Sequence, residues 1–177
     1  MGLERSPNDD LVRAAVAGDR AAFGALFERY AGLVHGVLLS RVERREVSDL
    51  MQDVFVSALG AIGQLRDPRA VGGWLATLAR NRATDHLRTR RRHEPFAEDE
   101  LGVTHADRSQ AEQVLATIRT LPEAYRETLV LRLVEGMSGP EIAAEVGLTP
   151  DSVRVNLHRG MALLRARLAG GAGEEAR

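Results

Sequence analysis

Cysteine is missing from the 177-residue sequence. Its absence excludes disulfide bonds, thiolate metal sites and thiol redox sensing. No stretch is long and apolar enough to span a bilayer, and the N-terminus lacks the basic start and apolar run of a signal peptide. We therefore expect a cytoplasmic protein that does not insert into membranes.

Aromatic residues make up only 4% of the chain, and alternating runs of β-branched residues are missing. Ala, Leu, Arg and Glu are abundant instead, and all four favour helices. The apolar residues recur at helical rather than strand spacing. The sequence therefore predicts an all-α protein, long enough for two small helical domains.

Lysine is absent as well, so all 24 basic residues are arginine. The net charge is −1, which argues against non-specific nucleic-acid binding by the chain as a whole. The distribution of charge is uneven, because residues 80–92 hold six arginines and one acid, whereas residues 94–107 are rich in Glu and Asp. A neutral total thus hides a basic block beside an acidic one.

Helical spacing and capping residues divide the chain into two halves. The predicted helices are a short one that begins near Asn8, then 21–41, 47–62, 69–92, 110–119, 122–135, 140–146 and 150–168. Residues 93–108 contain Pro, Gly and acids without periodicity, and we expect a flexible acidic linker there. The predicted domains are therefore 8–92 and 109–168, followed by a disordered tail at 169–177.

The pattern of a helix-turn-helix occupies the second domain. Ser138 and Glu141 can form a capping box, and Gly147 suits the positive φ of a tight turn. Thr149 and Pro150 are typical of the start of the next helix. Because these residues fall at the offsets of the motif, we favour DNA binding over a plain helical hairpin with a solvated arginine face.

One side of the helix that begins at Pro150 is apolar, through Val153, Leu157, Leu164 and Leu168. The other side would face DNA, since a recognition helix enters the major groove with its N-terminus first. The residues expected to reach base edges or phosphates are Thr149, Asp151, Ser152, Arg154, Val155, His158, Arg159 and Arg165.

Asp49, Gln52, Asp53 and Val56 share one face of the predicted helix 47–62, opposite an apolar stripe. An acidic face with one apolar residue suits a basic protein partner, and an ordinary solvated face fits the spacing equally well. The two aspartates could also bind a metal ion. However, no cluster of His, Asp or Glu elsewhere completes a metal site, so we expect no metal, no cofactor and no enzyme activity.

The predicted helix 69–92 carries a basic face opposite its apolar stripe. This face consists of Arg80, Asn81, Thr84, Arg88 and Arg91, and it extends over roughly 16 Å of helix at 1.5 Å per residue. So many guanidinium groups repel one another unless an anion lies between them. We therefore favour a nucleic-acid surface over a merely solvated one.

Several short motifs occur in a characteristic order along the chain. They are Asp49–Phe55 (DLMQDVF), Trp74-Leu75, Ala79-Arg80-Asn81, Asp85–Arg88 (DHLR), Val153-Arg154 and Leu157–Arg159 (LHR). With these motifs, residues from about 10 to 168 resemble the extracytoplasmic-function group of bacterial sigma factors. The resemblance implies two helical domains, called region 2 and region 4. It also implies that the chain directs core RNA polymerase to promoters, recognises their −10 and −35 elements and melts the DNA.

Roles for single residues follow from the same resemblance. Asp49, Gln52 and Asp53 match positions that bind the clamp helices of the polymerase β′ subunit. Arg80, Asn81 and Arg88 match the surface that melts and reads the −10 element. The loop 64–73, with Arg66, matches one that captures a flipped-out base.

The resemblance also bears on the second half of the chain and on its partners. The helix from Pro150 matches the reader of the −35 element, although Asn156 and Met161 stand where the family is often basic. The acidic linker corresponds to a segment that threads toward the polymerase cleft. Further implied partners are the polymerase β flap, promoter DNA and an anti-sigma factor.

The alternative is a helix-turn-helix regulator that does not join polymerase as a sigma subunit. A response regulator of this kind would have alternating strands and helices with an acidic phosphorylation pocket before residue 100. The sequence contains neither feature, so the sigma-factor hypothesis is preferred.

Overall fold

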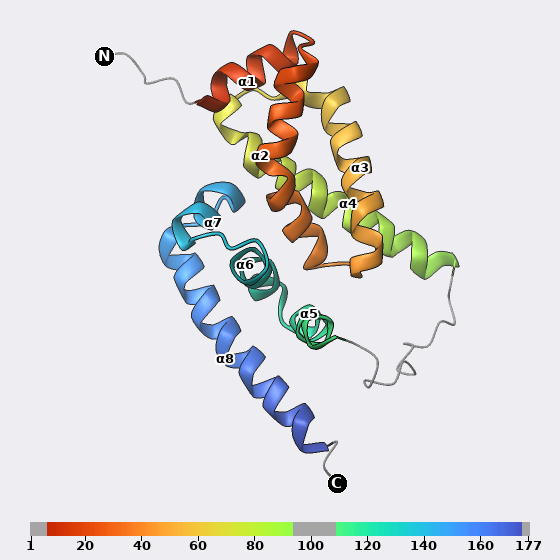
Figure 1. Cartoon of the computed structure of the whole chain (residues 1–177), viewed down its shortest axis with the longest axis vertical. Coiled ribbons are helices and arrows are strands. Elements are labelled where there is room, and N and C mark those ends of the chain that lie inside the picture. The colour runs from red at the N-terminus through yellow and green to blue at the C-terminus, as the bar shows by residue number, and fades with distance from the viewer. Residues whose placement is uncertain (1–6, 94–108, 175–177) are drawn as a thin grey trace.

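The computed structural model describes residues 7–93 and 109–174, and in these ranges the regular structure is helical, as predicted (Figure 1). The N-terminal half comprises α1 (Pro7–Val16), α2 (Arg20–Leu39), α3 (Arg44–Ala61), the 3₁₀ turns η1 (Ile62–Gln64) and η2 (Pro68–Ala70), and α4 (Val71–His93). The C-terminal half comprises α5 (Gln110–Thr120), α6 (Glu123–Leu133), α7 (Gly139–Val146) and α8 (Pro150–Glu174). Apart from His93, which ends α4, the predicted linker lies outside the described residues.

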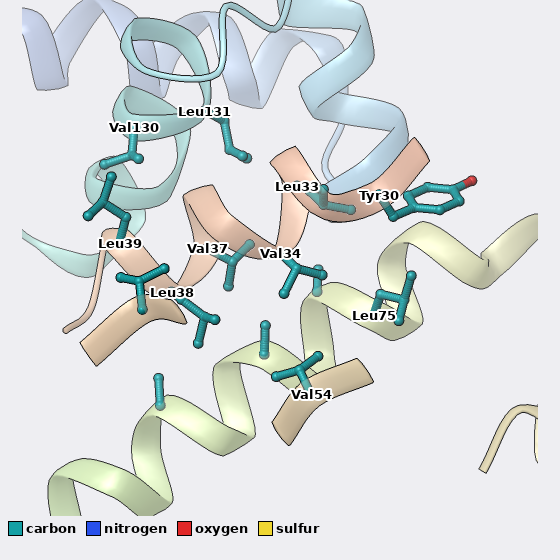
Figure 2. Packing of buried hydrophobic residues seen from close by; sticks show 14 of the residues in the cluster. Tyr30, Leu33, Val34, Val37, Leu38, Leu39, Val54, Leu75, Val130 and Leu131 are labelled. Carbon is teal, nitrogen blue, oxygen red and sulfur yellow. The ribbon is translucent and has the colours of Figure 1, made fainter. Parts of the chain in front are cut away.

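Helix α2 is the centre of the N-terminal half and packs against α1, α3 and α4. It begins where Asp19 Oδ1 accepts hydrogen bonds from the backbone N–H groups two and three residues later, at 2.8 and 3.1 Å. These bonds satisfy two donors that a helix start leaves unpaired. Val34 of α2 is fully buried in one apolar cluster with Val54 of α3 and Leu75 of α4 (Figure 2).

Small side chains on α4 permit a close approach to the neighbouring helices. Ala76, Ala79 and Ala83 are completely buried at intervals of three and four residues, which is one face of a helix. Trp74 is only partly buried and packs at the edge of this face. Burial of this alanine face fixes the rotation of α4 about its axis. The polar residues of α4 are therefore turned away from the apolar face.

The helix-turn-helix consists of α7 and α8, and its caps are those that the sequence predicts. Ser138 N donates to Glu141 Oε2 (2.7 Å), and Glu141 N donates to Ser138 Oγ (3.4 Å), which completes the capping box. Gly147 ends α7 with φ of +74°, in the left-handed region that favours glycine. Val153 of α8 is fully buried, so the exposed side of α8 is also fixed.

The two halves of the chain pack against each other. Helix α6 lies on α2 and α7 lies on α4. Val130 and Leu131 of α6 belong to the same buried cluster as Leu39 of α2, and Figure 2 shows them side by side. The chain therefore has one continuous apolar core that runs through both predicted domains.

The C-terminal end differs from the prediction. Helix α8 continues to Glu174, so residues 169–174 of the predicted disordered tail are helical, and residues 175–177 lie outside the described range. Extending an existing helix is far easier than starting one, which is why the glycines of this segment do not stop α8. Leu168, expected on the apolar side, is 37% exposed. None of the described helices is long and apolar enough to cross a membrane.

Candidate nucleic-acid and protein interfaces

The outer face of α3 presents the residues singled out in the sequence. Asp49 and Gln52 are exposed, Asp53 is partly exposed, and Val56 exposes 72% of its surface. The opposite face is buried through Leu50, Val54, Phe55 and Ala58. An apolar side chain as exposed as Val56 gains nothing from the fold, so it is free to pack against another molecule.

Asp53 is held by a neighbour that the sequence did not predict. Its Oδ2 atom accepts hydrogen bonds from Nε of Arg82 (3.0 Å) and from Nη2 of the same guanidinium, which ties α3 to α4. Both side chains remain about half exposed, at 47% and 45%. This pair neutralises part of the acidic face, so Asp49 carries more of the remaining negative charge.

The basic face of α4 is divided in the structure. Asn81, Arg88 and Arg91 are exposed, and the Arg88 guanidinium lies 3.8 Å from the exposed carboxylate of Asp85. Thr84 is partly buried and donates its hydroxyl hydrogen to the backbone oxygen of Arg80 (2.8 Å). The face therefore offers one amide and two guanidinium groups to solvent.

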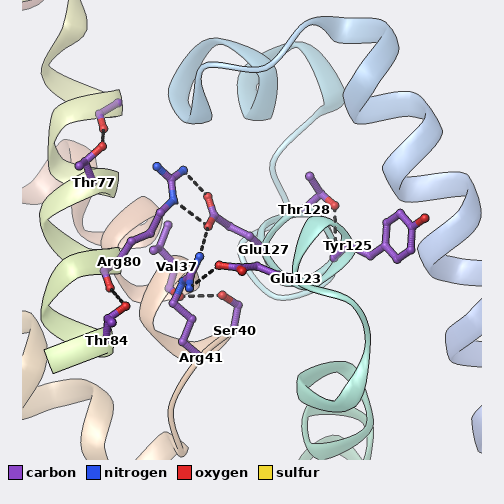
Figure 3. Close-up of polar contacts among 11 residues, drawn as sticks. Val37, Ser40, Arg41, Thr77, Arg80, Thr84, Glu123, Tyr125, Glu127 and Thr128 are labelled. Atoms are coloured by element: carbon purple, nitrogen blue, oxygen red, sulfur yellow. Dashed lines mark hydrogen bonds and ion pairs between the residues drawn. The ribbon is translucent and has the colours of Figure 1, made fainter. Parts of the chain in front are cut away.

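Arg80 is the exception on this face, because it lies against the C-terminal half (Figure 3). Its Nε donates to Glu127 Oε2 (3.0 Å) and its Nη2 donates to Glu127 Oε1 (2.6 Å), a bidentate pair. The hydrogen bond to Glu127 raises the pKa of Arg80 against the opposing effect of burial. The side chain of Arg80 is only 28% exposed in this arrangement.

The predicted capture loop, residues 64–73, is short and well defined. Asp67 Oδ1 accepts from the backbone N–H of Arg69 (3.0 Å) and caps η2. Arg66 is exposed between η1 and η2. Gly72, at the start of α4, is buried beneath Glu145 of α7.

The N-terminal part of α8 has the orientation expected of a recognition helix. Thr149 Oγ1 accepts from Ser152 N (3.1 Å) and so caps the helix. Arg154 is exposed and its Nη2 lies 3.1 Å from Asp151 Oδ1, one turn earlier. Further exposed residues on α8 are Val155, His158, Arg159 and Arg165.

Sequence reasoning missed the residues that join the two halves. Glu127 is 91% buried on α6, and Arg41, which follows α2, contacts it and also Glu123 (2.8 Å). His35 Nδ1 of α2 lies 2.6 Å from Glu135 Oε1, just after α6. The sequence does contain one signal for this contact, because Glu127 lies beside the apolar run of α6. A carboxylate that is buried there needs a cationic partner. The sequence alone does not say which arginine supplies it.

Known proteins resemble both halves of this chain. Residues 26–93 match the family model for sigma-70 region 2, and residues 111–164 match that for sigma-70 region 4. The RNA polymerase sigma factor CarQ of Myxococcus xanthus is 35% identical over 159 residues, which cover 85% of this chain and 91% of CarQ. The ECF RNA polymerase sigma factor SigM of Mycobacterium tuberculosis (strain ATCC 35801 / TMC 107 / Erdman) is 36% identical over 175 residues, or 96% of this chain and 88% of SigM.

A solved structure agrees over nearly the full length. CnrH, an RNA polymerase sigma factor of Cupriavidus metallidurans, in complex with the cytosolic domain of CnrY superposes with a TM-score of 0.65 at 29% identity. The match covers 93% of this chain and 99% of that one. Because the matches span both halves, in the order that the motifs predicted, the chain belongs to the extracytoplasmic-function group of bacterial RNA polymerase sigma factors.

Proposed function

We propose that this sigma factor divides its task among three surfaces. Helix α3 binds core RNA polymerase, α4 opens and reads the −10 element, and the first turns of α8 read the −35 element. The observation that carries the proposal is that all three helices bury their apolar stripe and leave the predicted polar residues accessible, with Arg80 and Thr84, both partly buried, as the exceptions. The chain then acts as a DNA-binding subunit of the polymerase rather than as an enzyme.

Polymerase docking is assigned to Asp49, Gln52, Asp53 and Val56. The proposal is supported by the combination of exposed carboxylates with an exposed apolar side chain on one helix face. Acidic groups steer a basic partner surface toward α3, and burial of Val56 then adds apolar contact. By the family resemblance, the partner surface is the clamp-helix region of the β′ subunit, and region 4 contacts the β flap.

Promoter opening is assigned to α4 and to the loop before it. Asn81 offers an amide that can hydrogen-bond to an unpaired base, and Arg88 and Arg91 offer guanidinium groups for the phosphates. Arg66 lies at the loop where an extruded base would enter. Unpairing and unstacking a base costs a few kcal/mol, which contacts to the flipped base must offset.

Reading of the −35 element is assigned to the N-terminal half of α8. Arg154 and Val155 lie in the turns that enter a major groove first, and both point away from buried Val153. The Asp151 carboxylate holds the Arg154 guanidinium near the helix start, which lowers the freedom that Arg154 loses on binding. His158, Arg159 and Arg165 lie further along α8, where phosphates are the expected targets.

We further infer that an anti-sigma factor restrains this chain. The support is the relative CnrH, whose structure is a complex with the cytosolic domain of CnrY. Such a partner would compete with polymerase or DNA for the surfaces named above.

Run-off transcription tests the proposed function directly. Core polymerase that has been stripped of other sigma factors is incubated with a genomic promoter library, with and without this chain. We expect discrete transcripts only when the chain is present, from promoters that share one −35 and one −10 sequence. A regulator that does not join polymerase would bind DNA alone, would not co-purify with core enzyme and would yield no such transcripts; that result would overturn the proposal.

A further inference from the structure

We propose that Asp9 of α1 is a positioning residue for the loop 64–73, and that it acts through Arg69 of η2. In the free chain the two side chains lie close together without a hydrogen bond between them. Their pairing is completed when the loop holds an extruded base. The proposal rests on the base-capture role proposed above for this loop, and it adds to that role a residue from outside the loop.

Asp9 is a buried acid in the first turn of α1. Its side chain exposes only 8% of its surface, and within the described residues its Oδ1 atom has no hydrogen-bond partner. Its Oδ2 atom lies 3.9 Å from Arg69 Nε, which is beyond hydrogen-bonding distance. A buried carboxylate that lacks hydrogen bonds raises the free energy of the folded state, so its place there needs a reason.

Neither the helix dipole nor the anchoring of α1 explains why Asp9 is buried. An acid in the first turn of a helix is favoured by the helix dipole, but exposed Asp10 supplies such an acid without any burial. Asn8 ties α1 to α2, because its Nδ2 donates to the hydroxyl oxygen of Tyr30 (2.6 Å). Both tasks are performed by other residues, which leaves the loop as the element on which Asp9 acts.

The loop lies directly against α1 (Figure 1). Helix α1 packs on η1 and on η2, the two 3₁₀ turns that precede α4. The hydrogen bond from Arg69 N to Asp67 Oδ1 (3.0 Å) fixes the local shape of η2, but it does not fix where η2 lies relative to the core. A bond to Asp9 fixes this position, since α1 is anchored in the core through buried Val12.

The pair closes by movement of Arg69 and not of Asp9. Asp9 is enclosed, whereas the side chain of Arg69 is 52% exposed and has room to turn. A hydrogen bond between a guanidinium and a carboxylate is charge-assisted and about twice as strong as a neutral one. Closing the pair therefore supplies the partner that the buried carboxylate lacks.

Pairing and base capture are coupled through η2. Arg66, at the point where an extruded base would enter, precedes η2 by two residues. A fixed η2 therefore holds this entry point in one arrangement, and the loop loses less freedom when the base arrives. By linkage, a loop state that favours the base is favoured by the base in return, so the pair closes on capture.

Binding of single-stranded DNA by the holoenzyme measures base capture. The full chain is assembled with core polymerase and titrated against a fluorescein-labelled −10 oligonucleotide, taken from a promoter obtained in the run-off experiment. In a matched set of oligonucleotides, an abasic nucleotide replaces one position at a time. The captured base is the one whose removal weakens binding of the unchanged chain most. A set in which no removal weakens binding would contradict base capture itself, and with it this inference.

Asp9→Asn is the decisive variant, and Asp10→Asn, at an exposed position of α1, is its matched control. The amide keeps the shape of the side chain but lacks the charge that binds a guanidinium. We expect Asp9→Asn to weaken binding of the intact oligonucleotide about tenfold and to match the unchanged chain on the abasic one. Asp10→Asn should match the unchanged chain on both. No loss for Asp9→Asn, or an equal loss on both oligonucleotides, would overturn the positioning role while base capture stands.

Urea denaturation of the chain alone distinguishes positioning from a purely structural role. A neutral amide is cheaper to bury than an unpaired carboxylate, so Asp9→Asn should be at least as stable as the unchanged chain. A denaturation midpoint clearly below that of Asp10→Asn would show that Asp9 serves the fold, and it would overturn the proposal.

Arg69→Gln tests whether Asp9 acts through Arg69. This change removes the partner at a half-exposed side chain and leaves the buried site of Asp9 intact. We expect Arg69→Gln to weaken binding of the intact oligonucleotide, and we expect Asp9→Asn to add no further loss to it, because both changes remove the same interaction. Additive losses would contradict action through Arg69.

Discussion

Glu46 illustrates how one side chain can hold two elements of this protein. Its Oε2 atom accepts from the backbone N–H of Glu43 (3.0 Å), which completes a capping box at the start of α3. Its Oε1 atom lies 2.8 Å from His86 Nε2 of α4 and 3.6 Å from Arg90. Burial alone would raise the pKa of Glu46, but the hydrogen bonds from His86 and Glu43 outweigh it, and the pKa is lowered.

A lowered pKa in the folded state makes stability depend on pH. The contribution of ionised Glu46 is present above its unfolded pKa and is lost as pH falls through the folded value. We expect Glu46→Gln, which keeps the capping oxygen, to lower the free energy of unfolding by about 1–2 kcal/mol at pH 7. The difference from wild type should shrink as pH falls below the ordinary glutamate pKa and through the lowered folded pKa of Glu46, because wild-type Glu46 then becomes protonated too.

Urea denaturation at pH 7 and at the lowest pH where the wild-type chain stays folded measures this difference. Glu28→Gln, an exposed carboxylate, should have little effect at either pH. An equal loss for Glu46→Gln at both pH values would mean that Glu46 acts through packing and not through its charge.

Two arginines on the exposed side of α8 should make different kinds of contact with DNA. Arg154 lies in the first turns of α8 beside Asp151, whereas Arg165 lies three turns further along the exposed side. We expect Arg154→Ala to cost about 1–3 kcal/mol at one base position and to relax preference there. Arg165→Ala should weaken binding to all sequences alike and lower the salt dependence by about one charge.

A −35 element with every base varied, read by transcription at two salt concentrations, separates these two effects. If Arg154→Ala lowers all sequence variants uniformly, Arg154 is a phosphate contact and the assigned docking of α8 is wrong. Asn156 of α8 is partly buried and stands where the resemblance leads us to expect a basic residue. The −35 contacts of this chain can therefore differ from the family pattern, and comparing Arg154→Ala with Arg165→Ala tests them directly.

At the scale of a whole element, α4 joins the core to the proposed DNA surface. Its alanine face fixes its rotation, and Asn81 and Arg88 are exposed as a consequence. We expect Asn81→Ala and Arg88→Ala each to reduce promoter opening roughly tenfold, the equivalent of about one hydrogen bond, and to affect closed-complex binding less. Thr89→Ala, exposed on α4 but about 100° around the helix from Arg88, serves as the control.

Permanganate reactivity on duplex promoter DNA and on a template with a pre-melted bubble distinguishes opening from binding. The bubble should restore activity to both variants, since the step that they impair has already occurred. Failure of the bubble to restore either variant would contradict the melting role.

The elements themselves could be predicted from the sequence because their signals are local. The boundaries of α7 follow from Ser138, Glu141 and Gly147, which lie within ten residues of one another. The contact of Arg80 with Glu127 spans 47 residues. Nothing in the sequence around Arg80 distinguishes it from the exposed Arg88. The continuous basic face predicted for α4 is therefore interrupted by tertiary packing.

In the whole molecule the two halves form one core, although the proposed function requires two separated DNA readers. Helix α6 lies on α2 and α7 lies on α4 in the structure. Docking on polymerase can supply the separation, because a fixed spacing converts two weak DNA contacts into one strong and specific one. The near-neutral charge of the chain fits this division, since a chain without a large net positive charge is expected to bind DNA weakly by itself.

A single cross-linking experiment can show whether the exposed face of α3 binds core polymerase. A photoreactive amino acid replaces Val56, which is 72% exposed, and the chain is irradiated with core enzyme. We expect a single major adduct with the β′ subunit, and we expect it to be lost when Asp49→Arg is introduced on the same face. A chain that co-purifies with core enzyme but forms no β′ adduct, or one that does not bind core enzyme at all, would contradict it.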